Sequence, residues 1–121
     1  MRVKDALGRY GEDVAVRQLE ADGMVVLARN WRCPERELPG EIDVVARDGR
    51  DLVVCEVKTR TGTAFGTPAE AVTPDKQARL RRLAGAWLRE SGLRVRGIRF
   101  DVVSVVRGRD GFSVEHLRDA F

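Results

Sequence analysis

The chain has 121 residues, of which 43% are hydrophobic and 34% charged, with a net charge of +3 at pH 7. This length allows a single domain, residues 1–121, and no apolar run approaches the roughly 20 residues that a membrane span needs. The N-terminal segment turns polar too early for a signal peptide, so a cytoplasmic protein without a membrane partner is expected. Cys33 and Cys55 have no CxxC partner, and Cys55 is expected to be a buried apolar residue rather than a disulfide or zinc ligand.

The first half of the chain predicts one helix, one strand and one hairpin. Apolar residues recur with helical spacing over 3–21, and Gly23 supplies a C-terminal stop. Gly8 and Gly11 each weaken such a helix by about 1 kcal/mol relative to alanine, which suggests close packing at these positions. The expected strands occupy residues 24–31, 41–47 and 51–59.

The second half predicts a capped helix followed by two strands. Thr73 is a suitable N-cap, Pro74 suits the first helical position, and Gly92 ends the helix after about Ser91. The last two strands are expected at 95–106 and 112–117. The order α-β-β-β-α-β-β is typical of an α/β domain with a mixed central sheet flanked by helices.

Three charged residues interrupt the apolar strands of the hairpin: Asp43, Glu56 and Lys58. Successive side chains of a strand point to opposite faces, so the hairpin residues divide into two sets per strand. The expected faces are Glu41, Asp43 and Val45 against Ile42, Val44 and Ala46 in the first strand, and Val54, Glu56 and Lys58 against Val53, Cys55 and Val57 in the second.

The turn of the hairpin decides which charged residues meet. With a two-residue turn at 49–50, Asp43 faces Glu56 and Glu41 faces Lys58. A two-residue turn one position earlier shifts the register by two and keeps all four residues on the same face. A three-residue loop separates them, because a slip of one residue inverts the faces of a strand.

Directly opposed carboxylates repel each other, and a divalent cation is the usual compensation. Mg²⁺ binds one or two carboxylates together with waters and phosphate oxygens, with Mn²⁺ as a second candidate. Asp43 and Glu56 are the candidate ligands, and Lys58 would hold or deprotonate an attacking water whose pKa the metal lowers. The alternative is a Glu41–Lys58 ion pair with both acids facing solvent, but the apolar residues on both faces argue against an exposed hairpin.

Asp43, twelve intervening residues and Glu56-Val57-Lys58 match the D-(x)n-E-x-K signature of restriction-endonuclease-like nucleases. Further segments extend the match over about residues 8–106. They are Gly11-Glu12, Ala28-Arg29-Asn30-Trp31-Arg32, Gly40-Glu41-Ile42-Asp43, Glu56-Val57-Lys58-Thr59-Arg60, Phe65-Gly66, Lys76-Gln77 and Arg99-Phe100-Asp101. Together they resemble the YraN-type family of small bacterial proteins, which are predicted endonucleases similar in fold to archaeal Holliday-junction resolvases.

That resemblance implies a restriction-endonuclease-like core and metal-dependent hydrolysis of DNA phosphodiester bonds, including branched DNA in recombination or repair. It implies Asp43, Glu56 and Lys58 as the metal and catalytic centre. It also suggests Glu12, in the first helix, as a further acidic member. From the residues alone, Glu12 could equally be a solvated residue of the helix surface.

A basic stripe on the second expected helix is the candidate DNA contact. Lys76, Arg79 and Arg82 recur every three residues, and Gln77 lies beside the first of them. Arg60 lies in a glycine- and threonine-rich loop at 59–68, whose threonine hydroxyls and backbone amides could bind phosphates. The alternative for the stripe is an ordinary solvated helix face.

Four residues outside these motifs have open roles. Trp31 could stack on a base, although a core position is the more common role for tryptophan. Trp87 is expected in the core. Asp101 interrupts another apolar strand and could support the site or pair with a neighbouring arginine such as Arg99. His116, the only histidine, is expected to be structural or at the surface.

Three classes of function fit these observations. The first is a Mg²⁺-dependent DNA endonuclease, for which a homodimer would be the means of cutting both strands with so small a chain. The second is a nucleic-acid-binding module of the same fold that cleaves poorly or not at all. The third is an interaction protein that dimerises through its sheet. The intact set of two acids and one lysine favours the first over the second.

Overall fold

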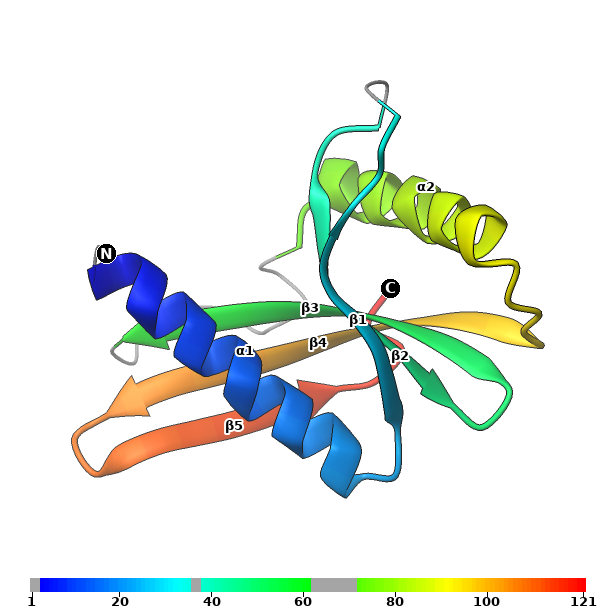
Figure 1. The fold of residues 1–121 in the computed structure, drawn as a ribbon. Coiled ribbons are helices and arrows are strands. Elements are labelled where there is room, and N and C mark those ends of the chain that lie inside the picture. Colours follow the sequence, from blue (N-terminus) through cyan, green and yellow to red (C-terminus); the bar gives the residue numbers. More distant parts are fainter. Residues whose placement is uncertain (1–2, 36–37, 62–71) are drawn as a thin grey trace.

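The structure is a computed structural model that describes residues 3–35, 38–61 and 72–121 (Figure 1). The elements follow the predicted order: α1 (Val3–Ala21), β1 (Val25–Arg32), β2 (Glu41–Asp48), β3 (Asp51–Thr61), α2 (Pro74–Ser91), β4 (Gly97–Gly108) and β5 (Gly111–Leu117). The strands form one sheet in the order β1-β2-β3-β4-β5, in which only β3 and β4 are parallel. The predicted mixed α/β arrangement is confirmed. Neither α1 nor α2 combines the length and apolar character of a membrane span.

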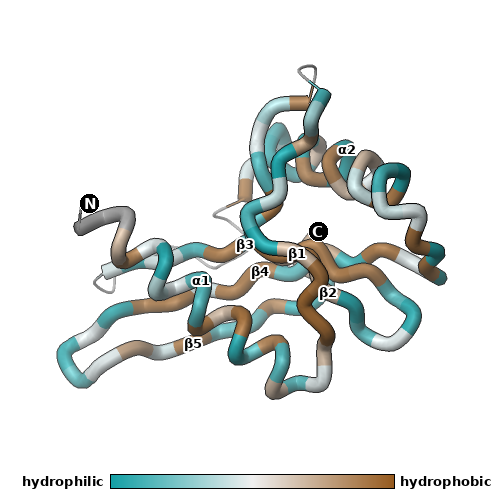
Figure 2. The backbone as a smooth tube through the Cα atoms, in the orientation of Figure 1, coloured by the Kyte–Doolittle hydropathy of each residue, from teal (hydrophilic) through white to brown (hydrophobic). Residues whose placement is uncertain are grey.

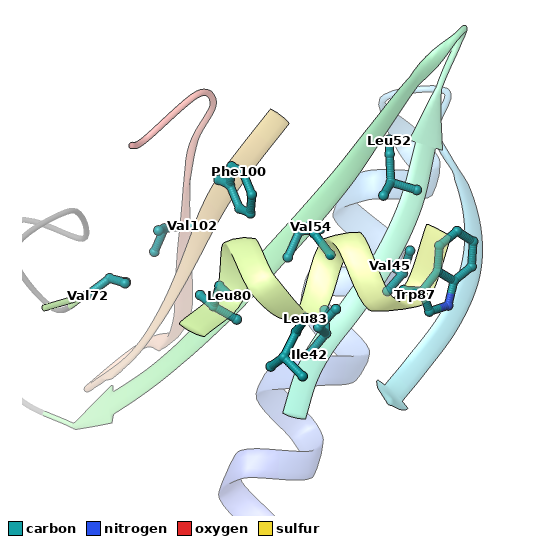
Figure 3. Close-up of a cluster of buried hydrophobic side chains, with 11 residues drawn as sticks. Ile42, Val45, Leu52, Val54, Val72, Leu80, Leu83, Trp87, Phe100 and Val102 are labelled. Atoms are coloured by element: carbon teal, nitrogen blue, oxygen red, sulfur yellow. The ribbon is translucent and has the colours of Figure 1, made fainter. Parts of the chain in front are cut away.

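The two helices lie on opposite faces of the sheet, and each covers an apolar cluster (Figure 1). Figure 3 shows the α2 side, where Leu80, Leu83 and Trp87 face the side chains of Ile42, Val45 and Val54. The α1 side is built from Ala15, Leu19, Met24, Val44, Ala46, Val53, Cys55, Val103 and Val105. Because the central strands are buried on both faces, their apolar runs are nearly continuous, as the brown segments of Figure 2 show. Trp87 and Cys55 are buried as predicted, and both cysteines are free.

Local signals set both ends of α2. The Thr73 hydroxyl accepts a hydrogen bond from the Lys76 backbone N–H at 3.2 Å, and Pro74 is the first helical residue. Gly92 adopts a left-handed conformation with φ of 71° and donates its N–H to Leu88 O. The predicted caps are therefore confirmed, and they hold the first turn of α2 in a defined position.

The hairpin has the predicted two-residue turn at 49–50. Asp48 pairs with Asp51, and the same register continues to Val44 and Cys55. The predicted division into faces holds in β3, where Val54 joins the α2 cluster while Val53 and Cys55 join the α1 cluster.

Beyond Val44, however, β2 leaves β3 and pairs only with β1. Two predictions therefore fail. Asp43–Glu56 and Glu41–Lys58 are not ladder pairs, and Ile42 lies with Val45 in the α2 cluster instead of with Val44. The physical reason is an irregular ladder: past Val44 only β1 holds β2, and Asn30, between the Arg29–Val44 and Trp31–Ile42 pairs, has a positive φ of 52° that interrupts the regular alternation.

Gly11 allows α1 to approach β3 closely. This glycine is buried, and a Cβ added to it would overlap the Thr59 hydroxyl oxygen. At Gly8, one turn earlier, a Cβ would have no heavy atom within 4 Å. The prediction of close packing is thus confirmed for Gly11 and wrong for Gly8. The contact at Gly11 therefore sets the distance between the next residue, Glu12, and the sheet.

We expect Gly11→Ala to destabilise the protein by about 1–3 kcal/mol, because the methyl group forces α1 away from Thr59. Gly8→Ala is the matched control, and we expect it to stabilise the protein by up to about 1 kcal/mol through helix propensity alone. Equilibrium unfolding in urea measures both changes. Equal shifts in the two variants would contradict the packing role of Gly11.

Candidate active site

A pocket of about 330 Å³ opens between α1, β2 and β3. Its lining includes all four residues predicted as catalytic, which come from three separate elements: Glu12 from α1, Asp43 from β2, and Glu56 and Lys58 from β3. The remaining lining residues are Leu7, Gly8, Val57 and Thr59. Folding therefore brings the four predicted residues together, although Glu12 and Lys58 lie 46 positions apart in the sequence.

Asp43 lies where β2 separates from β3. Its carboxylate accepts a hydrogen bond of 2.9 Å from the Val57 backbone N–H. Val57 lies two residues beyond Cys55, the last residue of β3 that pairs with β2. In a continued ladder Val57 would oppose Ile42, so the side chain takes the place of the missing strand partner. Burial, followed by the nearby charge of Glu56, raises the pKa of Asp43 to about 7.

Glu56 is almost fully buried, with a side-chain exposure of 5%, and two lysines approach it. Lys76 Nζ of α2 lies 2.5 Å from Glu56 Oε1, and Lys58 Nζ lies 3.8 Å from the same oxygen. Burying a carboxylate without a cationic partner costs a large desolvation free energy. The site therefore contains two cations beside its most buried acid.

Lys58 is the cation predicted to act on the attacking water. Its pKa is lowered, first by burial and then by the positive charge of Lys76. The neighbouring carboxylates of Glu56 and Asp43 act in the opposite direction. A lysine with a lowered pKa is better suited to accept a proton than an ordinary surface lysine.

Glu12 and Glu41 join Asp43 in a cluster of carboxylates. One oxygen of each lies within 4.8 Å of the others, and all three side chains are half-buried. Burial raises the pKa of Glu12, against the effect of a hydrogen bond with Asn30. Glu12 is thus part of the pocket rather than a solvated surface residue. Three hard oxygen donors at this spacing suit Mg²⁺ or Mn²⁺.

Glu41 has a different ion-pair partner from the one considered in the sequence. It pairs with Arg32 at 3.1 Å, its neighbour across the β1–β2 ladder, and not with Lys58. The alternative of a Glu41–Lys58 pair is therefore wrong. The cause is again the departure of β2 from β3, which carries Glu41 away from Lys58 and toward β1.

The candidate DNA-binding residues do not form one surface. Lys76 reaches inward to Glu56, and the Gln77 side chain donates to Val72 O at 3.1 Å. Arg79 is half-buried beside Gly40, whereas Arg82 is exposed. Arg60 lies near the end of β3 and is half-buried. The threonine-rich segment after Thr61 lies outside the described residues.

Two members of the site were missed as such in the sequence. Lys76 was grouped with the basic stripe, although the Thr73 N-cap fixes it in the first turn of α2, where its side chain can reach the sheet. Glu41 had no assigned role. Its spacing of two from Asp43 was the available signal, since residues i and i+2 of a strand share a face.

A second group of charges surrounds Asp101, away from the pocket lining. Asp101 is fully buried and accepts two hydrogen bonds from Arg99 and one from the Asp119 backbone N–H. A further hydrogen bond joins its carboxylate to His116 Nε2. His116 is 8% exposed and also lies 3.6 Å from Asp22. Asp101 therefore pairs with Arg99, which is one of the two roles that the sequence left open for it. His116 has a structural role, in agreement with the prediction. Trp31 is half-buried against the α2 cluster.

Comparison with known proteins gives the relationships of the chain. Residues 11–105 match the family model described as "Uncharacterised protein family UPF0102". A UPF0102 protein of Beutenbergia cavernae is 60% identical over 119 residues, which is 98% of each chain. A UPF0102 protein of Frankia alni is 59% identical over 122 residues, covering 100% of this chain and 98% of the relative. The chain belongs to the UPF0102 family.

Proposed function

We propose that this protein is a divalent-metal-dependent endonuclease that hydrolyses phosphodiester bonds in DNA. The observation that supports this most is the convergence of Glu12, Asp43, Glu56 and Lys58 in one pocket. The mixed sheet with a helix on each face and the D-(x)n-E-x-K spacing are compatible with a restriction-endonuclease-like core. A pocket of acids beside a half-buried lysine suits hydrolysis of an anionic ester better than simple binding.

In this proposal the acids bind the metal, and Lys58 accepts a proton from the attacking water. Asp43 and Glu56 are ligands, with Glu12 and Glu41 close enough to Asp43 to contribute. A bound Mg²⁺ would lower the pKa of water and polarise the phosphate. The Val57 N–H orients the Asp43 carboxylate. The lowered pKa of Lys58 favours its taking a proton from the attacking water.

The DNA backbone would be held by positive side chains of α2. Arg82 is exposed on α2, and Arg79 lies one turn before it on the same helix. We propose branched or otherwise structured DNA as the substrate, with a second copy of the chain supplying the cut on the other strand. Binding should weaken with rising salt in proportion to the number of phosphates contacted.

One observation favours a second candidate, a nucleic-acid-binding module with weak or no cleavage. The Glu56 carboxylate is already held by Lys76, at 2.5 Å, and a metal has to compete with that contact. The same fold and basic residues would then serve binding alone. The two candidates differ in their response to metal.

The test combines metal binding with cleavage. Mn²⁺ and Mg²⁺ are titrated calorimetrically into wild type and Asp43→Ala, and both proteins are incubated with labelled four-way junction, duplex and single-stranded DNA. We expect wild type to bind metal and cut at least one substrate, and Asp43→Ala to lose cleavage by at least about 10³-fold. Metal binding without cleavage of any substrate would favour the binding module. A wild type that binds no metal would overturn the nuclease.

A further inference from the structure

Lys76 occupies a place that the D-(x)n-E-x-K signature does not include. It belongs to α2, on the opposite side of the sheet from α1, and its ammonium lies 2.5 Å from Glu56 Oε1. The backbone of Lys76 is fixed by the Thr73 cap. The Glu56 side chain is 5% exposed and that of Lys76 is 27% exposed, so the lysine contacts solvent much more than the acid does.

The charges around Glu56 explain why a cation is needed there. Asp43 and Glu56 line the same pocket, so a second carboxylate lies near Glu56. Lys58 is farther from Glu56 Oε1, at 3.8 Å, than Lys76. Without Lys76, the buried Glu56 carboxylate would have only the weaker contact with Lys58 among these two cations for compensation. An uncompensated buried charge is strongly unfavourable.

We propose that Lys76 is a positioning residue that acts as an internal counter-cation and competes with the divalent metal for Glu56. The inference rests on the proposed function, since it concerns the same metal ligands. The ammonium holds Glu56 in place in the metal-free protein. A metal that uses the same oxygen must displace the ammonium, and the solvent-exposed part of the Lys76 side chain gives it room to withdraw. Lys76 thereby lowers the metal affinity of the site.

The test is a calorimetric titration of metal-free protein with Mn²⁺ alone. The variants are Lys76→Met, which removes the ammonium, and Lys76→Gln, which removes the charge but keeps a hydrogen-bond donor. Lys76→Arg retains the charge. Arg89→Met is the matched control, because it removes one positive charge from the exposed last turn of α2. Thermal unfolding of each variant shows that the fold is retained, and Lys76→Gln carries the test if Lys76→Met is unstable.

We expect Lys76→Met and Lys76→Gln to bind Mn²⁺ about tenfold more tightly than wild type. Lys76→Arg and Arg89→Met should remain within about twofold of wild type. If wild type binds Mn²⁺ and the Lys76 variants bind equally or more weakly, the inference is wrong while the metal site stands. Equally tight binding by Arg89→Met and the Lys76 variants would show a general charge effect and overturn the inference. If no protein binds Mn²⁺, the proposed function itself fails.

Discussion

Asp101→Ala is expected to lower the free energy of unfolding by about 3–5 kcal/mol. The Asp101 carboxylate is fully buried and holds Arg99, His116 and the Asp119 backbone N–H. Its removal leaves the half-buried Arg99 guanidinium with Asp48 as its remaining acidic partner and an unpaired N–H near the C-terminus. Breaking a buried ion pair from one side is costly because the remaining charge cannot regain full hydration.

Urea unfolding at pH 7 measures this loss. Asp110→Ala is the matched control, because it removes an exposed aspartate from the β4–β5 turn, and we expect it to change stability by less than about 0.5 kcal/mol. A loss below 1 kcal/mol for Asp101→Ala would mean that the Arg99 and His116 contacts contribute little. Because Asp101 lies outside the pocket lining, Mn²⁺ affinity of the folded variant should be close to that of wild type.

Asp43→Asn is expected to stabilise the metal-free protein by up to about 4 kcal/mol at pH 8 while removing the proposed metal-dependent cleavage. The pKa of Asp43 is raised from 3.8 to about 7, so the folded protein binds this proton more tightly than the unfolded chain does. Stability contributed by Asp43 is therefore present at low pH and is lost as pH rises from about 4 to 7. Asparagine carries no charge and can still accept the hydrogen bond from Val57.

The pH dependence gives this prediction its control. Near pH 4, where Asp43 is protonated in the folded wild type, the two proteins should have similar stability, and the difference should grow up to about pH 7. Thermal unfolding in buffer with a chelator measures it. Asp110→Asn, at an exposed position, should show no such trend. If Asp43→Asn is less stable than wild type at pH 8, the carboxylate is favourably paired rather than strained.

Most of the fold could be predicted because its signals are local. Thr73 and Gly92 determine the ends of α2, and the two-residue turn determines the hairpin register. The sequence could not show where β2 would leave β3, because nothing in residues 41–44 distinguishes a paired from a diverging strand. That divergence turns Ile42 toward α2 and lets Asp43 contact the Val57 backbone.

The candidate site was predicted in part for the same reason. Asp43, Glu56 and Lys58 were identified through residue type and spacing, and Glu12 only through the family resemblance. All four line the pocket. The role of Lys76 depends on which side of α2 meets the sheet and on the reach of a flexible side chain. Helical spacing alone grouped it with Arg79 and Arg82. Three-dimensional contact, and not charge pattern, separates the three residues.

The neighbours in the sheet are also neighbours along the chain, from β1 to β5. Every pairing except β3–β4 is antiparallel and joins its two strands through a short connection, so most of the sheet closes short loops during folding. The β2–β3 hairpin carries Asp43, Glu56 and Lys58, and its two-residue turn, like that of β4–β5, keeps the entropic cost of closing the loop low. Most of the charged residues of the pocket would then be in place before α1 packs against β3 through Gly11 and adds Glu12, the last carboxylate of the pocket.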